Sequence, residues 1–438
     1  MTGEARVIRA DRSQLRWDMV DLEALLPDDH RARVVWSFVE SLDLSELYAA
    51  IRSREGEAGH PAADPKVLLA LWLYATMQGV GAARELDRLA KRDLAYRWLA
   101  GGVPVNYHGL SDFRVGHVDL LDRLLSESVT ALVAEGLVSL AEISIDGTKV
   151  RASASKASFK TDATLSRIEA AVAARIAALK AELADDPAAG GARRQAARQR
   201  AARQRAARET ESRAAAARAT LDKLRAEKQE RAKTHAKDEA KKAEPKASLS
   251  DPEARHMRFP DGAMRPAFNA QIAAAAREGV IVAVAMTDRR NDAGLAVPMV
   301  ADIARRYGVV PDRLLVDTNY ATSEDIAALA GHAAGPVVVF APPPSEREAV
   351  KPATLARRAK AHAQEPDSLK QWRARMASAA GQAIYRSRKL IERINAERKN
   401  HGFGFIAVRG LAKAQAVALL HARAHNLLAA QRLRARAA

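Results

Sequence analysis

The sequence predicts an α/β sheet domain that follows a helical N-terminal region and is interrupted by a long helical hairpin. Apolar residues at helical spacing dominate residues 15–135. From residue 141 onward, short apolar runs typical of strands alternate with helical segments, an order that favours a mixed α/β sheet. An Ala- and Arg-rich stretch between residues 161 and 248 separates the first strand from the others.

The N-terminal region, residues 1–138, is predicted to contain several short helices. Residues 65–80 have helical apolar spacing, and Pro65 stands where a first-turn proline is tolerated. Residues 81–101 and 110–136 also fit helices, with Gly101, Gly102 and Pro104 between them. Such helices suit a helix-turn-helix type of DNA-binding module, and they suit a plain helical bundle equally well.

The sheet domain is predicted to comprise residues 139–160 and 249–438. Its first strand is residues 141–152, and two runs around Arg277-Glu278-Gly279 within 267–287 indicate a hairpin. Further strands are expected at 313–319 and 335–344. Helices are expected at 292–308 and 323–333, the second with Ser323 as its N-cap.

The inserted segment, residues 161–248, reads as two helices joined at Asp185-Asp186-Pro187 and Gly190-Gly191. Residues 193–208 contain seven arginines and no acidic residue, and the sequence AARQR occurs twice among them, at 196–200 and 201–205. Arg198 and Arg203 are therefore candidate contacts to DNA phosphates. The alternative is a solvated helix, since a five-residue period does not keep the arginines on one helical face.

The amino-acid composition indicates the kind of binding partner and excludes several kinds of site. The chain has 438 residues, 70 Lys and Arg against 53 Asp and Glu, and a formal net charge of +17, which favours a polyanion such as nucleic acid. A basic composition without a nucleic-acid partner is the alternative. Without cysteine, disulfides, Cys-ligated zinc, iron–sulfur clusters and thiol nucleophiles are excluded. No secretory signal or membrane span is apparent, and we expect a soluble, intracellular protein.

Two aspartates at apolar strands are candidate metal ligands. Asp146 follows Ile143-Ser144-Ile145 and is expected to enter a glycine turn at Gly147, and Asp317 follows Leu314-Leu315-Val316. A carboxylate in such a place is costly to desolvate unless a metal, a cation or hydrogen bonds compensate it. Each aspartate taken alone is explained equally by a turn. Motifs for phosphate loops, zinc proteases and acyl hydrolases are absent from the sequence.

A third group lies on the predicted helix 384–400. Tyr385, Arg388, Glu392 and Lys399 share one narrow face at about 100° per residue, whereas Leu390, Ile391 and Ile394 face the opposite side. One carboxylate between two cations and a phenol suits a site for a metal and a phosphodiester. An amphipathic surface helix with an Arg–Glu pair is the alternative.

These residues match Tyr-x2-Arg-x3-Glu-x6-Lys, and the chain here resembles DDE transposases of bacterial insertion sequences. The N-terminal segments DLEALLPDDHRARVVW and HPAADPKVLLALWLYATMQG resemble the InsH-type N-terminal domain of these proteins. SIDGTKVRASAS and LLVDTNYATSEDI resemble the segments around their two catalytic aspartates. The similarity extends over nearly the whole chain except residues 161–248 and 345–380.

The resemblance implies an RNase H-like catalytic domain in which Asp146, Asp317 and Glu392 are the catalytic residues and hold two Mg²⁺ ions, with Mn²⁺ as a possible substitute. It implies phosphate contacts for Arg388 and Lys399, and positioning of DNA by Tyr385. The implied activity is cleavage of double-stranded DNA at the terminal inverted repeats of the element and strand transfer into target DNA by a homodimer. A catalytically inactive or host-adopted DNA-binding protein or nuclease on the same scaffold is the alternative.

Overall fold

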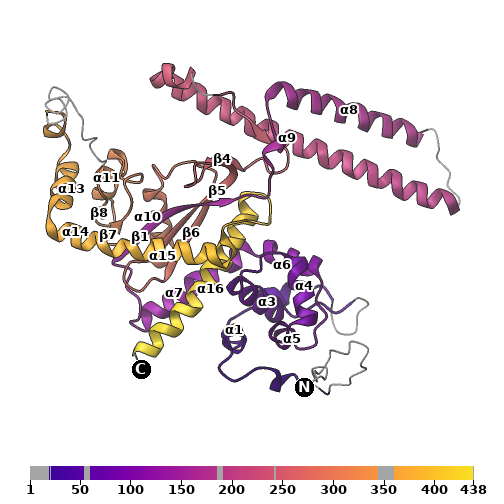
Figure 1. Cartoon of the computed structure of the whole chain (residues 1–438), viewed down its shortest axis with the longest axis horizontal. Coiled ribbons are helices and arrows are strands. Elements are labelled where there is room, and N and C mark those ends of the chain that lie inside the picture. Colours follow the sequence, from indigo (N-terminus) through magenta and orange to yellow (C-terminus); the bar gives the residue numbers. More distant parts are fainter. Residues whose placement is uncertain are drawn as a thin grey trace, which may run out of the picture.

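The computed structural model describes residues 19, 21–53, 60–184, 191–240, 243–343 and 360–437. Its N-terminal region is helical, as predicted, and packs beside a mixed sheet (Figure 1). The elements of this region are η1 (Glu23–Leu25), α1 (Arg31–Glu40), α2 (Ser45–Ala50), α3 (Pro65–Met77), α4 (Ala83–Arg92), α5 (Leu94–Ala100), α6 (Tyr107–Gly116) and α7 (Val118–Ala134).

Helix α3 is the centre of the helical region. Asp64 caps it by accepting a hydrogen bond from the Lys66 N–H at 2.8 Å, and Pro65 is its first residue, where the missing N–H costs nothing. Every residue from Leu69 to Met77 is buried, as expected for a helix surrounded by others on all sides. The Trp72 indole N–H donates to the Leu110 carbonyl oxygen at 2.8 Å and so ties α3 to α6.

Two predicted helices are each divided in the structure. Asp93 ends α4 in an extended conformation and caps α5 through its side chain, which accepts from the N–H groups of Ala95 and Tyr96. His117, which has non-helical dihedral angles, separates α6 from α7. In both cases a single residue redirects the chain without interrupting the apolar pattern, which is why the pattern alone predicted longer helices.

The sheet has the strand order β4-β5-β1-β7-β8, with β6 also paired to β5. Strand β1 is antiparallel to β5 and parallel to β7, and β7 is parallel to β8. Strands β4 and β6 are antiparallel to successive parts of β5. The strands are β1 (Glu142–Arg151), β4 (Arg255–Arg258), β5 (Met264–Ala275), β6 (Ile281–Thr287), β7 (Arg313–Leu315) and β8 (Val338–Phe340).

Helices α10 (Ala296–Tyr307) and α11 (Ser323–Ala330) follow β6 and β7 as predicted. The N-cap of α11 is Thr322, whose hydroxyl accepts from the Asp325 N–H at 3.0 Å, so the prediction of Ser323 as the cap was wrong by one residue. Both residues carry a hydroxyl, and only the extended dihedral angles of Thr322 distinguish the cap. The C-terminal elements are α13 (Asp367–Ala377), α14 (Ala379–Tyr385), η3 (Arg386–Arg388), α15 (Lys389–Arg398), η4 (Lys399–Phe403) and α16 (Leu411–Ala437).

The insertion forms two helices, α8 (Asp162–Ala184) and α9 (Gly191–Ala240), which project from the sheet (Figure 1). A short sheet closes their base, where β2 (Phe159–Lys160) pairs with β3 (Ala247–Ser248). Leu165, Ala214, Ala217, Leu221 and Ala247 form a small separate core there. Arg218 on α9 pairs with Asp162 and Glu169 on α8, so charge as well as apolar packing joins the two helices.

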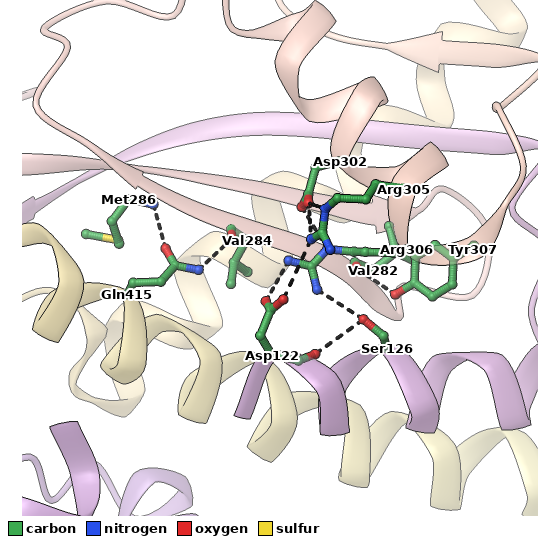
Figure 2. Close-up of polar contacts among 10 residues, drawn as sticks. All are labelled: Asp122, Ser126, Val282, Val284, Met286, Asp302, Arg305, Arg306, Tyr307 and Gln415. Carbon is green, nitrogen blue, oxygen red and sulfur yellow. Dashed lines mark hydrogen bonds and ion pairs between the residues drawn. The ribbon is translucent and has the colours of Figure 1, made fainter. Parts of the chain in front are cut away.

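Helix α16 connects the sheet to the helical region, with contacts to β6, α7, α3 and α6 (Figure 1). Its amide side chains satisfy backbone groups of β6. Gln415 accepts from the Met286 N–H and donates to the Val284 carbonyl oxygen, as Figure 2 shows. Asn426 makes the same pair of bonds with the N–H and carbonyl oxygen of Ile281. These amides occupy the hydrogen-bonding groups that an edge strand would otherwise leave unpaired.

A second polar connection joins α10 to α7 (Figure 2). The buried guanidinium of Arg306 donates to Asp122 at 2.6 Å, to Asp302 at 2.7 Å and to Ser126 at 3.1 Å. The Tyr307 hydroxyl donates to the Val282 carbonyl oxygen at 2.7 Å. One continuous hydrophobic core includes side chains of the helical region and of the sheet. None of the helices in the described part of the chain is long and apolar enough to cross a membrane.

Candidate active site

Asp146 lies on β1, and Asp317 lies two residues beyond the end of the adjacent parallel strand β7. Ser144 of β1 is paired with Leu315 of β7, so two further residues along the chain from each bring Asp146 near Asp317, whose charge acts on Asp146. Neighbouring strands are about 4.8 Å apart, and residues two apart face the same side of a sheet. Parallel pairing therefore brings together two carboxylates that are 171 positions apart in the chain (317 − 146).

The surroundings of Asp146 differ from the predicted glycine turn. Asp146 lies within β1, and Gly147 continues the strand opposite Gln271, so the prediction of a turn was wrong. Close packing requires glycine at position 147, because a Cβ there would lie 2.2 Å from Oδ1 of Asp292. That carboxylate accepts hydrogen bonds from Asn269 and Gln271 of β5. Glycine therefore lets Asp292 lie against the backbone directly after Asp146.

The predicted helix 384–400 is divided into α14, a 3₁₀ turn, α15 and a wide turn that begins at Lys399. Four predicted residues of this segment nevertheless face the same site. Arg388 donates to Oδ1 of Asp146 at 2.7 Å and to Oε1 of Glu392 at 2.5 Å, so its buried guanidinium bridges the two carboxylates. Tyr385 lies in the electrostatic field of Arg388, Asp317 and Glu392, and Lys399 in that of Asp146.

Burial and neighbouring carboxylates control protonation at the site. The pKa of Asp146 is raised to about 6, chiefly by burial and further by the charges of Asp317 and Asp292. The attraction of Arg388 and a hydrogen bond from Asn395 oppose this increase. Burial also raises the pKa of the Tyr385 phenol and lowers the pKa of the Lys399 ammonium. Burial is therefore the main cause of the altered protonation at this site, and the neighbouring charges modify it.

Several residues of the site were not identified from the sequence. Asn395 donates to Oδ2 of Asp146 at 2.7 Å, and Tyr320, fully buried, hydrogen-bonds to Gln271 beside Asp292. Asn395 lies three residues after Glu392 on α15, and this helical spacing could have identified it. The position of Asp292 had no sequence signal, because it depends on the pairing of β5 with β1.

The predicted carboxylates are not arranged as an open set of metal ligands. Both oxygens of Asp146 are occupied by Arg388 and Asn395, and Asp317 accepts from the backbone N–H and side chain of Asn319. Among the described residues, no three His, Asp or Glu side chains are arranged to hold a metal ion. Arg198 and Arg203 are exposed on α9, in the projecting hairpin (Figure 1).

Comparisons with known proteins define the class. Residues 243–428 match the family model of a transposase DDE domain, and residues 20–115 match that of a transposase domain (DUF772). The first range includes Asp317 and Glu392, whereas Asp146 lies between the two ranges. No curated protein and no solved structure matches the chain.

Both matched domains are transposase domains, and together they span more than half of the chain. More particularly, the chain combines a transposase DDE domain with a second transposase domain, in agreement with the resemblance to DDE transposases seen in the sequence. This class of enzyme acts on DNA and generally uses divalent metal ions.

The donor set fits such ions chemically. Asp146, Asp317 and Glu392 offer carboxylate oxygens, which Mg²⁺ and Mn²⁺ prefer. The guanidinium of Arg388 bridges Asp146 and Glu392, so a positive charge already lies where these two carboxylates meet. The raised pKa of Asp146 indicates that additional positive charge would stabilise its ionised form.

Proposed function

We propose that this protein is a transposase that cleaves DNA at the ends of its element and joins the freed ends to target DNA. In this proposal residues 139–160 and 249–438 form an RNase H-like catalytic domain. Residues 1–138 form a DNA-binding domain, and residues 161–248 are an inserted basic hairpin. The observation that carries the proposal is the pairing of β1 with β7, which supports a shared site for Asp146 and Asp317, with Glu392 joined to it through Arg388.

Asp146, Asp317 and Glu392 are the proposed catalytic residues and ligands of two Mg²⁺ ions. Bound there, such ions would activate the attacking oxygen and stabilise the leaving oxygen of an in-line displacement. In cleavage, water forms the new P–O bond, and the 3′-oxygen of the element leaves as a hydroxyl. In strand transfer that hydroxyl attacks a target phosphodiester, so one P–O bond replaces another and no ATP is consumed.

The remaining residues are assigned to DNA. Arg388 neutralises Asp146 and Glu392 in the metal-free protein, and we assign it a phosphate contact when DNA is bound. Lys399 supplies a second phosphate contact, and Tyr385 positions DNA near the cut. Arg198 and Arg203 contact the duplex outside the site. The substrates are the terminal inverted repeats and target DNA. A homodimer is proposed because two ends must be cut, and DNA binding would place the protein at the bacterial nucleoid in the cytoplasm.

The test is cleavage of a duplex that carries the DNA flanking the gene, with Mg²⁺ or Mn²⁺. Asp146→Asn, Asp317→Asn and Glu392→Gln should each reduce cleavage at least 1,000-fold, an effect on the order of that of losing an essential catalytic group, and leave binding of the duplex largely intact. Glu324→Gln, an exposed carboxylate of α11, is the matched control. Cleavage that survives in all three variants contradicts the proposal.

One observation favours an inactive scaffold as a second candidate. Arg388 and Asn395 occupy both oxygens of Asp146, an arrangement that a DNA-binding protein without catalysis could retain. A wild-type protein that binds the duplex and neither cleaves it nor joins pre-cleaved ends would support this candidate. Cleavage without joining would indicate a host-adopted nuclease.

A further inference from the structure

A small pocket lies between the helical region and the C-terminal helices, outside the candidate active site. Its volume is about 20 Å³, room for roughly one water-sized group. Trp72 and Arg114 line it from α3 and α6, and His401, Phe405 and His421 line it from the C-terminal part. Gly79, Gly402 and Phe405 at its rim are exposed, whereas Trp72, Arg114 and His421 are buried.

The pocket contains a cation without a counter-ion. Arg114 is 6% exposed, its Nη1 donates to the Gly81 carbonyl oxygen, and its guanidinium stacks 4.4 Å from the centroid of the Trp72 ring. No carboxylate of the described residues forms an ion pair with it, and its Nε has no partner among them. Burial lowers the pKa of Arg114 to about 10. A buried charge left in this way is costly, and an anion would remove the cost.

A second unpartnered group lines the same pocket. His421 is 8% exposed, and its Nδ1 has no hydrogen-bond partner among the described residues. The rim is fixed by close backbone contact, because a Cβ on Gly402 would lie 2.9 Å from the Gly79 carbonyl oxygen, and Gly402 has φ +89°. The backbone of the rim is therefore held in place before any ligand arrives, which lowers the entropy cost of binding.

The position of the pocket indicates which anion it receives. Arg151, at the end of β1, lies with its guanidinium 5.7 Å from the ring centroid of Phe405 at the rim. Asp146 is five residues before Arg151 on β1, a distance of about 17 Å at the rise of a strand. A duplex bound at Asp146 can extend over such a distance, so a backbone phosphate is the anion that reaches the pocket.

We propose that this pocket receives one non-bridging oxygen of a backbone phosphate of the DNA duplex, bound through Arg114 and His421. The proposal rests on the proposed function, because it takes DNA as the substrate. It assigns to the junction between the two matched domains a role in fixing the position of DNA relative to the active site. The buried guanidinium supplies the charge, and the preformed rim supplies the geometry.

Two substitutions and their controls test the proposal in the full-length protein, with chelator present so that no cleavage occurs. Arg114→Gln removes the charge, and Arg88→Gln removes an exposed arginine that pairs with Glu85 on α4. Ala407→Glu places a carboxylate at the pocket lining with Arg114 unchanged, and Ala407→Gln is its neutral control. Circular dichroism confirms folding of each variant.

Inorganic phosphate and a short duplex are the two probes. At constant ionic strength, phosphate should raise the Tm of the wild type and of both controls, and should fail to do so in Arg114→Gln and Ala407→Glu. Duplex affinity should fall about 10-fold in Arg114→Gln, as expected for a lost charge-assisted hydrogen bond, and the slope of log K against log salt should decrease by about one.

Equal phosphate stabilisation or equal duplex affinity in Arg114→Gln and wild type would overturn the proposal, as would a pocket that holds only water and gives no Tm shift. If phosphate binds but Arg114→Gln has the same duplex affinity as the wild type, the pocket is a site for free phosphate, and the proposal is overturned. Failure of the proposed function is distinguishable, since it appears as absent cleavage in a protein that still binds the duplex.

Discussion

Asn395 helps to orient the carboxylate of Asp146. Its amide holds Oδ2 of Asp146 at 2.7 Å from α15. We predict that Asn395→Ala lowers the cleavage rate about 10- to 100-fold, the usual effect of removing a group that orients a metal ligand. Duplex affinity should remain within about twofold of wild type. Asn400→Ala, an exposed asparagine five residues later, is the control. Equal rates for the two variants would show that Asn395 does not position Asp146.

His421 makes stability depend on pH. Burial, with Arg398 and His401 nearby, lowers its pKa to about 3, so it stays neutral in the folded protein while an unfolded histidine titrates near 6.5. Below pH 6.5 this histidine is protonated in the unfolded state but stays neutral in the folded state. The free energy of unfolding therefore falls as the pH decreases toward 3. From pH 7 to pH 5 this loss is about 2 kcal/mol.

We predict that His421→Gln removes this part of the acid sensitivity, whereas His108→Gln, at an exposed histidine, does not. The measurement is the free energy of unfolding in urea at pH 7 and pH 5. If wild type and His421→Gln lose the same free energy over this interval, the buried neutral state of His421 is contradicted.

The sequence predicted the site residues that share a local pattern. Arg388 contacts both Asp146 and Glu392, although α14, η3 and α15 replace the continuous helix from which a common face with Tyr385 and Lys399 was predicted. Asp292 could not be predicted, because its contact with the backbone at Gly147 arises from pairing between β5 and β1, far apart in sequence. Local periodicity carries no information on such pairings.

At the scale of elements, the hairpin α8–α9 has its charge balanced near its base and unbalanced further along α9. Arg218 pairs with Asp162 and Glu169 near the base, whereas residues 193–208 contain no acidic residue. We predict that Arg198→Gln with Arg203→Gln weakens duplex binding and reduces the slope of log K against log salt by about two, one for each phosphate contact.

The control for the hairpin is Arg213→Gln, which removes an arginine of α9 that already pairs with Glu209. Its effect on the salt dependence should be much smaller, since an ion-paired arginine displaces fewer counterions. A salt slope in the double variant equal to that of the wild type would mean that α9 does not contact DNA along these arginines.

The sequence predicted most long elements and the short apolar strands β7 and β8, but it missed β2, β3 and β4. The helices of the insertion and strands β1, β5 and β6 have apolar patterns long enough to read. Strands β2, β3 and β4 have two to four residues each, and they exist because β5 and the base of the hairpin supply partners. Tertiary pairing rather than intrinsic propensity determines these three strands.

At the scale of the whole molecule, α16 holds the sheet and the helical region together. Asn426 supplies both the donor and the acceptor that the Ile281 backbone needs, deep in the shared core. We predict that Asn426→Ala lowers the free energy of unfolding by about 3 kcal/mol, because two buried backbone groups lose their partners. Gln431→Ala, exposed one turn later on the same helix, should change it by less than about 0.5 kcal/mol.

The variant Asn426→Ala also tests whether the helical region and the sheet unfold cooperatively. Since one continuous core includes both regions, near-UV signals from Trp72 and Trp98 in the helical region should be lost at the same urea concentration as that from Trp372 beside the sheet. Asn426→Ala should shift all of these transitions together. Separate transitions, with only the sheet affected by the substitution, would show that α16 does not couple the two regions, and would remove the physical basis for a DNA position fixed jointly by them.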